Sequence, residues 1–132
     1  MSQENVELAR RAYEALNPQE FSRFPEFFTP DVELDLSRNV FNPVTARGYE
    51  GVERLVGMVN DVWDDFRFEV EEVIDAGDRL LVAVRLSGKG KGSGVSVDQH
   101  DFHVVTVRDR RCARLEVHRD RAEALKAAGL SE

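Results

Sequence analysis

The chain opens with a helical pattern of apolar positions. Val6, Ala9, Tyr13 and Leu16 recur at steps of three and four residues, and Ser2 is placed to cap the segment. The pattern predicts an amphipathic first helix that lies on a core, with Tyr13 facing inward.

The next segment is rich in phenylalanine. Its aromatic residues are Phe21, Phe24, Phe27 and Phe28. Asparagine followed by proline at positions 17–18 favours the start of a second helix, which Pro25 is expected to break or kink. We interpret this segment as a lid of core aromatics.

A change to a period of two follows. Val32, Leu34 and Leu36 alternate with Asp31, Glu33 and Asp35, which predicts a half-buried strand. Residues 37–50 are expected to be irregular, because they include Pro43 and Gly48. A third amphipathic helix is predicted from Gly51 to about Trp63.

Four strands are predicted after this helix, at residues 66–74, 79–86, 95–108 and 112–119. Consecutive strands after helices favour an antiparallel meander, and hence an α+β fold. The glycine-rich stretch 88–94 lacks the following helix and the spacing of a phosphate-binding loop, so we interpret it as a hairpin connection. Asp120 and Gly129 are placed to begin and end a short last helix.

Strand parity predicts which side chains share a face. In segment 95–108, one row is apolar at both ends and carries Gln99, Asp101 and His103 in its middle. Matching rows are Val82, Val84 and Leu86 on the preceding strand, and Ala113, Leu115 and Val117 on the following one. The three polar side chains are therefore expected to project into an apolar wall.

The composition narrows the possible partners. A chain of 132 residues with 42% hydrophobic and 33% charged residues fits one globular domain, residues 1–132. The formal charge of −7 makes nucleic acid and membrane surfaces poor partners. No apolar run has the length of a signal core or a spanning helix, so we expect a cytoplasmic protein. Cys112 is the sole cysteine, and the histidines lack metal-ligand spacing, so neither a metal nor a cofactor is predicted.

Several stretches resemble the SnoaL-like family of the nuclear transport factor 2-like superfamily, as does the order of the predicted elements. They are residues 11–16 (RAYEAL), 27–33 (FFTPDVE), 49–52 (YEGV), 75–79 (DAGDR), 90–95 (GKGSGV) and 120–125 (DRAEAL). The resemblance spans nearly the whole chain. It implies a cone in which helices pack on a strongly bent sheet around an internal pocket. These motifs mark turns, caps and core, and they carry no catalytic signature.

Comparison with two enzymes of the superfamily limits the chemistry. The resemblance places His103 and Tyr13 where ketosteroid isomerase has its two oxyanion-hole residues, whereas Leu36 stands at the position of the general base. The Asp-Arg-Asp triad of limonene epoxide hydrolase falls on Val84, Leu86 and Val117. Neither activity is therefore expected.

Two hypotheses for function remain open. In the first, the protein is a cofactor-independent isomerase, cyclase or dehydratase that acts by proton transfer on a small apolar or aromatic carbonyl compound. His103 is then a general acid or base held by Asp101, and Tyr13 donates a hydrogen bond to the substrate. The expected ligand contacts are Gln99, Trp63, Phe24, Phe27, Leu36, Val84 and Val117. In the second, the same fold is a non-catalytic ligand-binding or homo-oligomeric assembly module. Gln99, Asp101 and His103 then only hydrogen-bond to one another inside a structural core.

The opposite sheet face mixes apolar and charged side chains. It carries Leu81, Ala83, Phe102 and Val104 among Arg85, His100, Arg114, Glu116 and His118. Such a face is expected to be covered, and we predict a homodimer through it.

Overall fold

The α+β architecture is as predicted. The computed structural model describes residues 2–15, 25–38 and 44–130, which form three helices and one sheet of six strands. The helices are α1 (Ser2–Ala15), α2 (Gly48–Val62) and α3 (Arg121–Ala127). The strands are β1 (Phe28–Leu36), β2 (Val44–Arg47), β3 (Trp63–Asp75), β4 (Arg79–Gly90), β5 (Ser96–Arg108) and β6 (Arg111–His118). The predictions for Phe21 and Phe24 lie outside the described residues.

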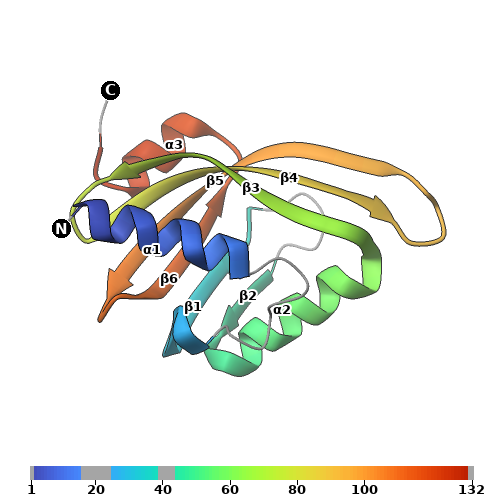
Figure 1. The fold of residues 1–132 in the computed structure, drawn as a ribbon, viewed down its shortest axis with the longest axis horizontal. Helices are drawn as coiled ribbons and strands as arrows, with labels where there is room; N and C mark the ends of the chain where they lie inside the picture. The colour runs from blue at the N-terminus through green and yellow to red at the C-terminus, as the bar shows by residue number, and fades with distance from the viewer. Residues whose placement is uncertain (1, 16–24, 39–43, 131–132) are drawn as a thin grey trace.

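The sheet is mixed, in the order β2-β1-β6-β5-β4-β3. Strands β3 to β6 form the predicted antiparallel meander, while β1 runs parallel to β6 and antiparallel to β2. The long strands curve around α1 and α2 on one side, and α3 lies on the other (Figure 1). We call the first side the inner face and the second the outer face.

The inner face carries the main core. From α1, Ala9 and Tyr13 pack on Leu80, Val82 and Val84 of β4. Val84 and its alternate neighbour Val82 are fully buried, as the period-two pattern predicted. A second cluster packs α2 on β1.

Residues 37–50 are less irregular than we predicted. Strand β2 occupies Val44–Arg47, and α2 begins at Gly48 rather than Gly51. Gly48 has a φ of +71°, a conformation that glycine adopts without steric cost, and it turns the chain directly from strand to helix. The helix also ends one residue early, so Trp63 is the first residue of β3.

The phenylalanine segment also differs from the prediction. Phe28 begins strand β1 rather than ending a helix. Phe27 and Phe28 are both buried in a cluster with Val32, Leu34 and Val52. The run of apolar residues is compatible with either structure, and pairing with β6 selects the strand.

A bulge in β6 changes its inner row. Thr106 pairs with Arg114, but Val107 pairs with Cys112, so Ala113 is the extra residue. Cys112 therefore packs against the inner-face clusters in the position predicted for Ala113. The rest of the predicted row, Leu115 and Val117, keeps its parity.

Helix α3 covers part of the outer face. Leu81 and Val104 are buried there against Ala124, Leu125 and Ala128. The chain itself thus accounts for some of the apolar surface from which we predicted a dimer. Coverage of the remainder by a second copy stays a prediction.

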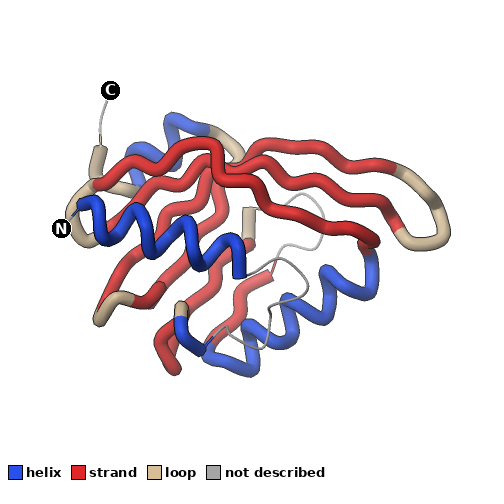
Figure 2. Tube along the Cα trace, in the orientation of Figure 1, coloured by secondary structure: helices blue, strands red, loops and turns tan. Residues whose placement is uncertain are grey.

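The glycine-rich stretch forms a hairpin connection, as predicted. Strand β4 continues to Gly90, and the hairpin extends beyond the body of the molecule (Figure 2). The backbone N–H of Lys91 donates to the carbonyl of Val62, which fixes the tip to the end of α2.

Candidate active site

Two of the predicted site residues meet on the inner face. The Tyr13 hydroxyl lies 2.5 Å from Nδ1 of His103, although the residues are 90 positions apart. Tyr13 is 6% exposed and His103 is 4% exposed. The ring of Phe68, on β3, lies edge-on to both of theirs. The helical spacing of Tyr13 and the strand parity of His103 therefore bring them together inside an apolar wall.

Burial keeps both groups neutral. It raises the pKa of Tyr13 well above its usual value, with a further contribution from Cys112. It lowers the pKa of His103 to about 4, and His118 adds to this effect. At neutral pH the pair therefore consists of a protonated hydroxyl and an uncharged imidazole.

Within the described residues, the Tyr13–His103 contact uses one of the two hydrogen-bond donors of this neutral pair. If the Tyr13 hydroxyl donates to Nδ1, the single N–H proton of the neutral imidazole is on Nε2 of His103. If Nδ1–H donates to the tyrosine oxygen, the hydroxyl proton is free to donate elsewhere, and Nε2 is an acceptor. Either arrangement offers a donor to a ligand oxygen in a dry environment, where such a bond is strong.

Asp101 contacts Gln99, as the hypothesis of a self-satisfied polar row expected, but among the described residues its second partner is Arg119 and not His103. Its carboxylate receives a hydrogen bond from Nε2 of Gln99 at 3.2 Å and an ion pair from Nε of Arg119 at 3.0 Å. Asp101 is only 2% exposed, and burial raises its pKa while Arg119 opposes the rise. Among the described residues, the side-chain hydrogen bond of His103 is with Tyr13, so Asp101 belongs to a second polar group on the same row.

The predicted apolar contacts divide into two sets. Val84 pairs with Asp101, and Val117 pairs with His103, so both border the polar row. Leu36 packs in the cluster of β1 and α2, where Phe27 is also buried. No structure is described for Phe24.

Trp63 lies far from His103. It pairs with Gly90, whereas His103 pairs with Val82, which precedes Gly90 by eight residues on β4. That separation is roughly 26 Å along a strand. The helix that was predicted to end at Trp63 ends before it, and the side chain packs near the β4–β5 hairpin instead.

Arg119 was not predicted as a site residue. The inner row of β6 runs through Leu115 and Val117, and one more alternate step reaches Arg119. The alternation of side chains along this strand was therefore enough to place Arg119 on the inner face. Phe68 was missed for a similar reason, because the parity of β3 was not followed.

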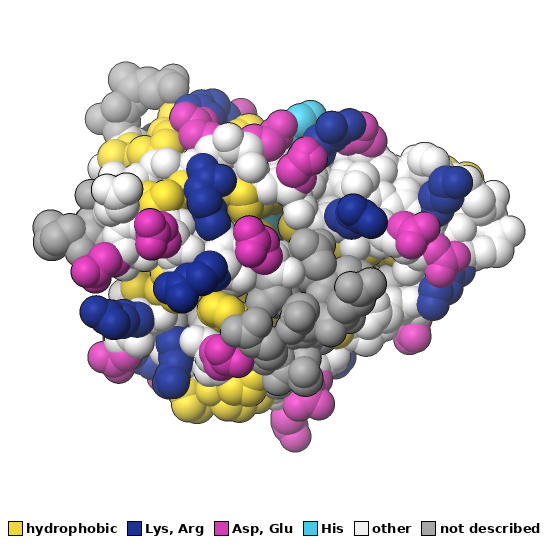
Figure 3. All heavy atoms as spheres, in the orientation of Figure 1, with side chains coloured by type: hydrophobic (Ala, Val, Ile, Leu, Met, Phe, Trp, Pro, Cys, Tyr) yellow, Lys and Arg dark blue, Asp and Glu magenta, His cyan; other side chains and the backbone are white. Residues whose placement is uncertain are grey.

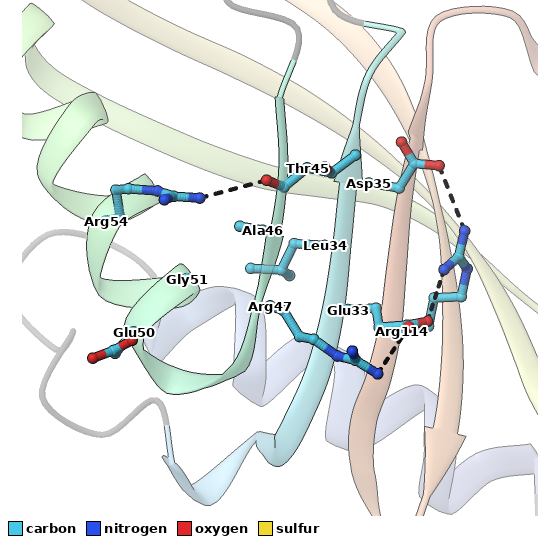
Figure 4. A pocket seen from close by; sticks show the side chains of 10 residues that line it. All are labelled: Glu33, Leu34, Asp35, Thr45, Ala46, Arg47, Glu50, Gly51, Arg54 and Arg114. Atoms are coloured by element: carbon cyan, nitrogen blue, oxygen red, sulfur yellow. Dashed lines mark hydrogen bonds and ion pairs between the residues drawn. The ribbon is translucent and has the colours of Figure 1, made fainter.

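A hollow of about 460 Å³ lies elsewhere, along β2 and the start of α2, and Figure 4 shows the side chains that line it. It is lined by Glu33, Leu34, Asp35, Thr45, Ala46, Arg47, Glu50, Gly51, Arg54 and Arg114. Most of the charged side chains that line it already have partners. Arg114 contacts Glu33 and Asp35, and Arg54 donates to the carbonyl of Thr45. Figure 3 likewise shows acidic and basic side chains intermixed on the face in view.

The sequence model of the SnoaL-like domain matches residues 9–115. The chain belongs to the SnoaL-like domain family. The match includes Tyr13, Asp101 and His103 and ends before Arg119. Comparison with curated protein sequences gives no match.

Solved structures share the fold of this SnoaL-like domain. An NTF2-like protein of unknown function from Burkholderia pseudomallei is 22% identical, with a TM-score of 0.77 over 93% of this chain and 95% of that one. A putative SnoaL-like polyketide cyclase from Jannaschia sp. CCS1 is 20% identical, with a TM-score of 0.76 over 99% and 95%. TerC, co-crystallised with polyporic acid, is 21% identical, with a TM-score of 0.76 over 96% and 98%.

The described residues of this SnoaL-like domain contain no group of three or more His, Cys, Asp or Glu side chains arranged to hold a metal ion. In the same ranges, no helix has the length and apolar character needed to cross a membrane.

Proposed function

We propose that this SnoaL-like domain binds a small apolar or aromatic carbonyl compound on its inner face and catalyses a proton transfer in that compound without a cofactor. The observation that carries the proposal is the buried contact between Tyr13 and His103. Its unused donor is suited to a carbonyl oxygen, and to the negative charge that develops on that oxygen during enolisation. Isomerisation, cyclisation and dehydration all pass through such a species.

The protonation states divide the roles. A His103 pKa of about 4 makes the imidazole a weak base at neutral pH, so we assign it to hydrogen bonding with Tyr13. Asp101 is the carboxylate on the same row, and burial raises its pKa. We assign it to accepting the proton from the carbon next to the carbonyl group.

A ketone with exchangeable protons tests both binding and chemistry. We expect the protein to bind 2-acetylnaphthalene more tightly than 2-ethylnaphthalene, which lacks the oxygen. We also expect it to speed deuterium uptake at the acetyl group in D₂O, followed by NMR, by about 100-fold or more over buffer. Tyr13→Phe and Asp101→Asn should each lower the exchange rate by at least about tenfold.

Tyr49→Phe is the matched control, because the Tyr49 hydroxyl donates to the carbonyl of Phe28 outside this group. It should leave exchange unchanged. Binding of the ketone without faster exchange would favour the alternative, a non-catalytic ligand-binding module. A protein that shows no preference for the ketone over the hydrocarbon would contradict the role of Tyr13 and His103.

A further inference from the structure

Of the arginines in the described ion pairs, Arg119 has the most buried acidic partner. Arg85, Arg108 and Arg121 contact exposed carboxylates, and those that Arg38 and Arg114 contact are at least 16% exposed. Arg119 instead contacts Asp101, whose side chain is 3% exposed, while 38% of its own side chain is exposed. It therefore extends from the buried polar row to the solvent.

The contact is an ion pair through the inner nitrogen of the guanidinium group. Nε lies 3.0 Å from Oδ1 of Asp101, and among the described residues Asp101 is the acidic partner of Arg119. The N–H donors of the two terminal nitrogens remain for another acceptor. A guanidinium held near its Nε by this ion pair can bind a carboxylate through its terminal nitrogens, because two parallel hydrogen bonds match the planar geometry of both groups.

The strand register gives the position of Arg119 relative to the Tyr13–His103 pair. Val117 pairs with His103, and Arg119 is two residues further along the chain, beside Asp101. Same-face neighbours on a strand are roughly 7 Å apart. A flat molecule that places an oxygen at Tyr13 and His103 can thus reach Arg119 with a second polar group.

We infer that Arg119 binds a carboxylate of the ligand, so that the site takes carbonyl compounds that also carry an acid group. This inference rests on the proposed function, because it requires a ligand on the inner face. Asp101 positions the guanidinium and prevents its charge from standing alone in a largely apolar wall.

Two probes that differ by one acid group test the inference. They are 6-acetyl-2-naphthoate and 2-acetylnaphthalene, with dissociation constants measured by calorimetry. We expect the acid to bind at least about tenfold more tightly than the ketone, since a charged hydrogen-bonded pair is added. Arg119→Gln should remove this preference, so that the dissociation constants of the two probes differ by less than about twofold.

Arg121→Gln is the matched control. Arg121 contacts Glu72 with a similar exposed fraction, 42%, but from α3, and its substitution should leave both affinities unchanged. If Arg119→Gln does not fold, Arg119→Lys keeps the charge without the planar fork, and should lower only the affinity for the acid, by about threefold.

The outcomes separate the two proposals. A wild-type protein that binds the ketone but gains nothing from the acid group contradicts the role of Arg119 alone. Equal losses for both probes on substitution of Arg119 also contradict it, since they would mean that Arg119 only supports the shape of the site. A wild-type protein that binds neither probe contradicts the proposed function, and the carboxylate site with it.

Discussion

Between pH 7 and pH 4, the free energy of unfolding is expected to fall by about 3 kcal/mol less in His103→Asn than in the wild-type protein. The reason is that the pKa of His103 falls from 6.5 to about 4 on folding. As the pH drops below 6.5, the unfolded chain binds a proton that the folded protein does not. The stability that neutral His103 contributes is present above pH 6.5, and it is lost as the pH falls toward 4. Asparagine does not titrate, and its side-chain oxygen still offers Tyr13 an acceptor.

The measurement is urea unfolding of both proteins at several pH values. Carboxylates titrate in both, so the difference between their unfolding free energies isolates the imidazole. If the free energy of unfolding depends on pH in the same way in both proteins, His103 is solvated and does not form a buried pair with Tyr13.

Leu81→Ala is expected to lower the free energy of unfolding by about 2–5 kcal/mol. Leu81 is fully buried on the outer face of β4, where it packs in the cluster with Ala124, Leu125 and Ala128 of α3. Truncation loses the apolar contacts and leaves a cavity that the flanking helix fills only in part.

Val95→Ala is the control, because Val95 is 63% exposed and its truncation should change stability by less than about 0.5 kcal/mol. A loss below about 1 kcal/mol for Leu81→Ala would show that α3 leaves this face uncovered in solution. In that case the whole outer face would need another molecule to cover it, as the homodimer prediction assumed.

Periodic patterns predicted most of the fold. Alternation in β4 and β5 placed Val82, Val84 and His103 on one face, and helical spacing turned Tyr13 toward them, because both periods follow directly from backbone geometry. Irregular features were not predictable in this way. The bulge at Ala113 shifts parity without a distinct sequence signal, and Gly48 begins a helix directly after a four-residue strand that pairs with β1.

Side-chain partners were harder to predict than faces. Parity placed Asp101 beside His103, and the two were expected to interact. The neighbouring strand supplies a stronger partner in Arg119, because a buried carboxylate is stabilised most by a charged donor. Which of several polar neighbours pair depends on reach and direction across strands, and a single sequence does not encode these in any periodic pattern.

The most direct test of the buried pair is the state of the His103 ring nitrogens, followed by ¹⁵N NMR from pH 8 to pH 5. The account predicts one protonated and one unprotonated nitrogen throughout this range, with the Nδ1 signal displaced in Tyr13→Phe. Titration of His103 with a midpoint near 6.5, unaffected by Tyr13→Phe, would contradict it.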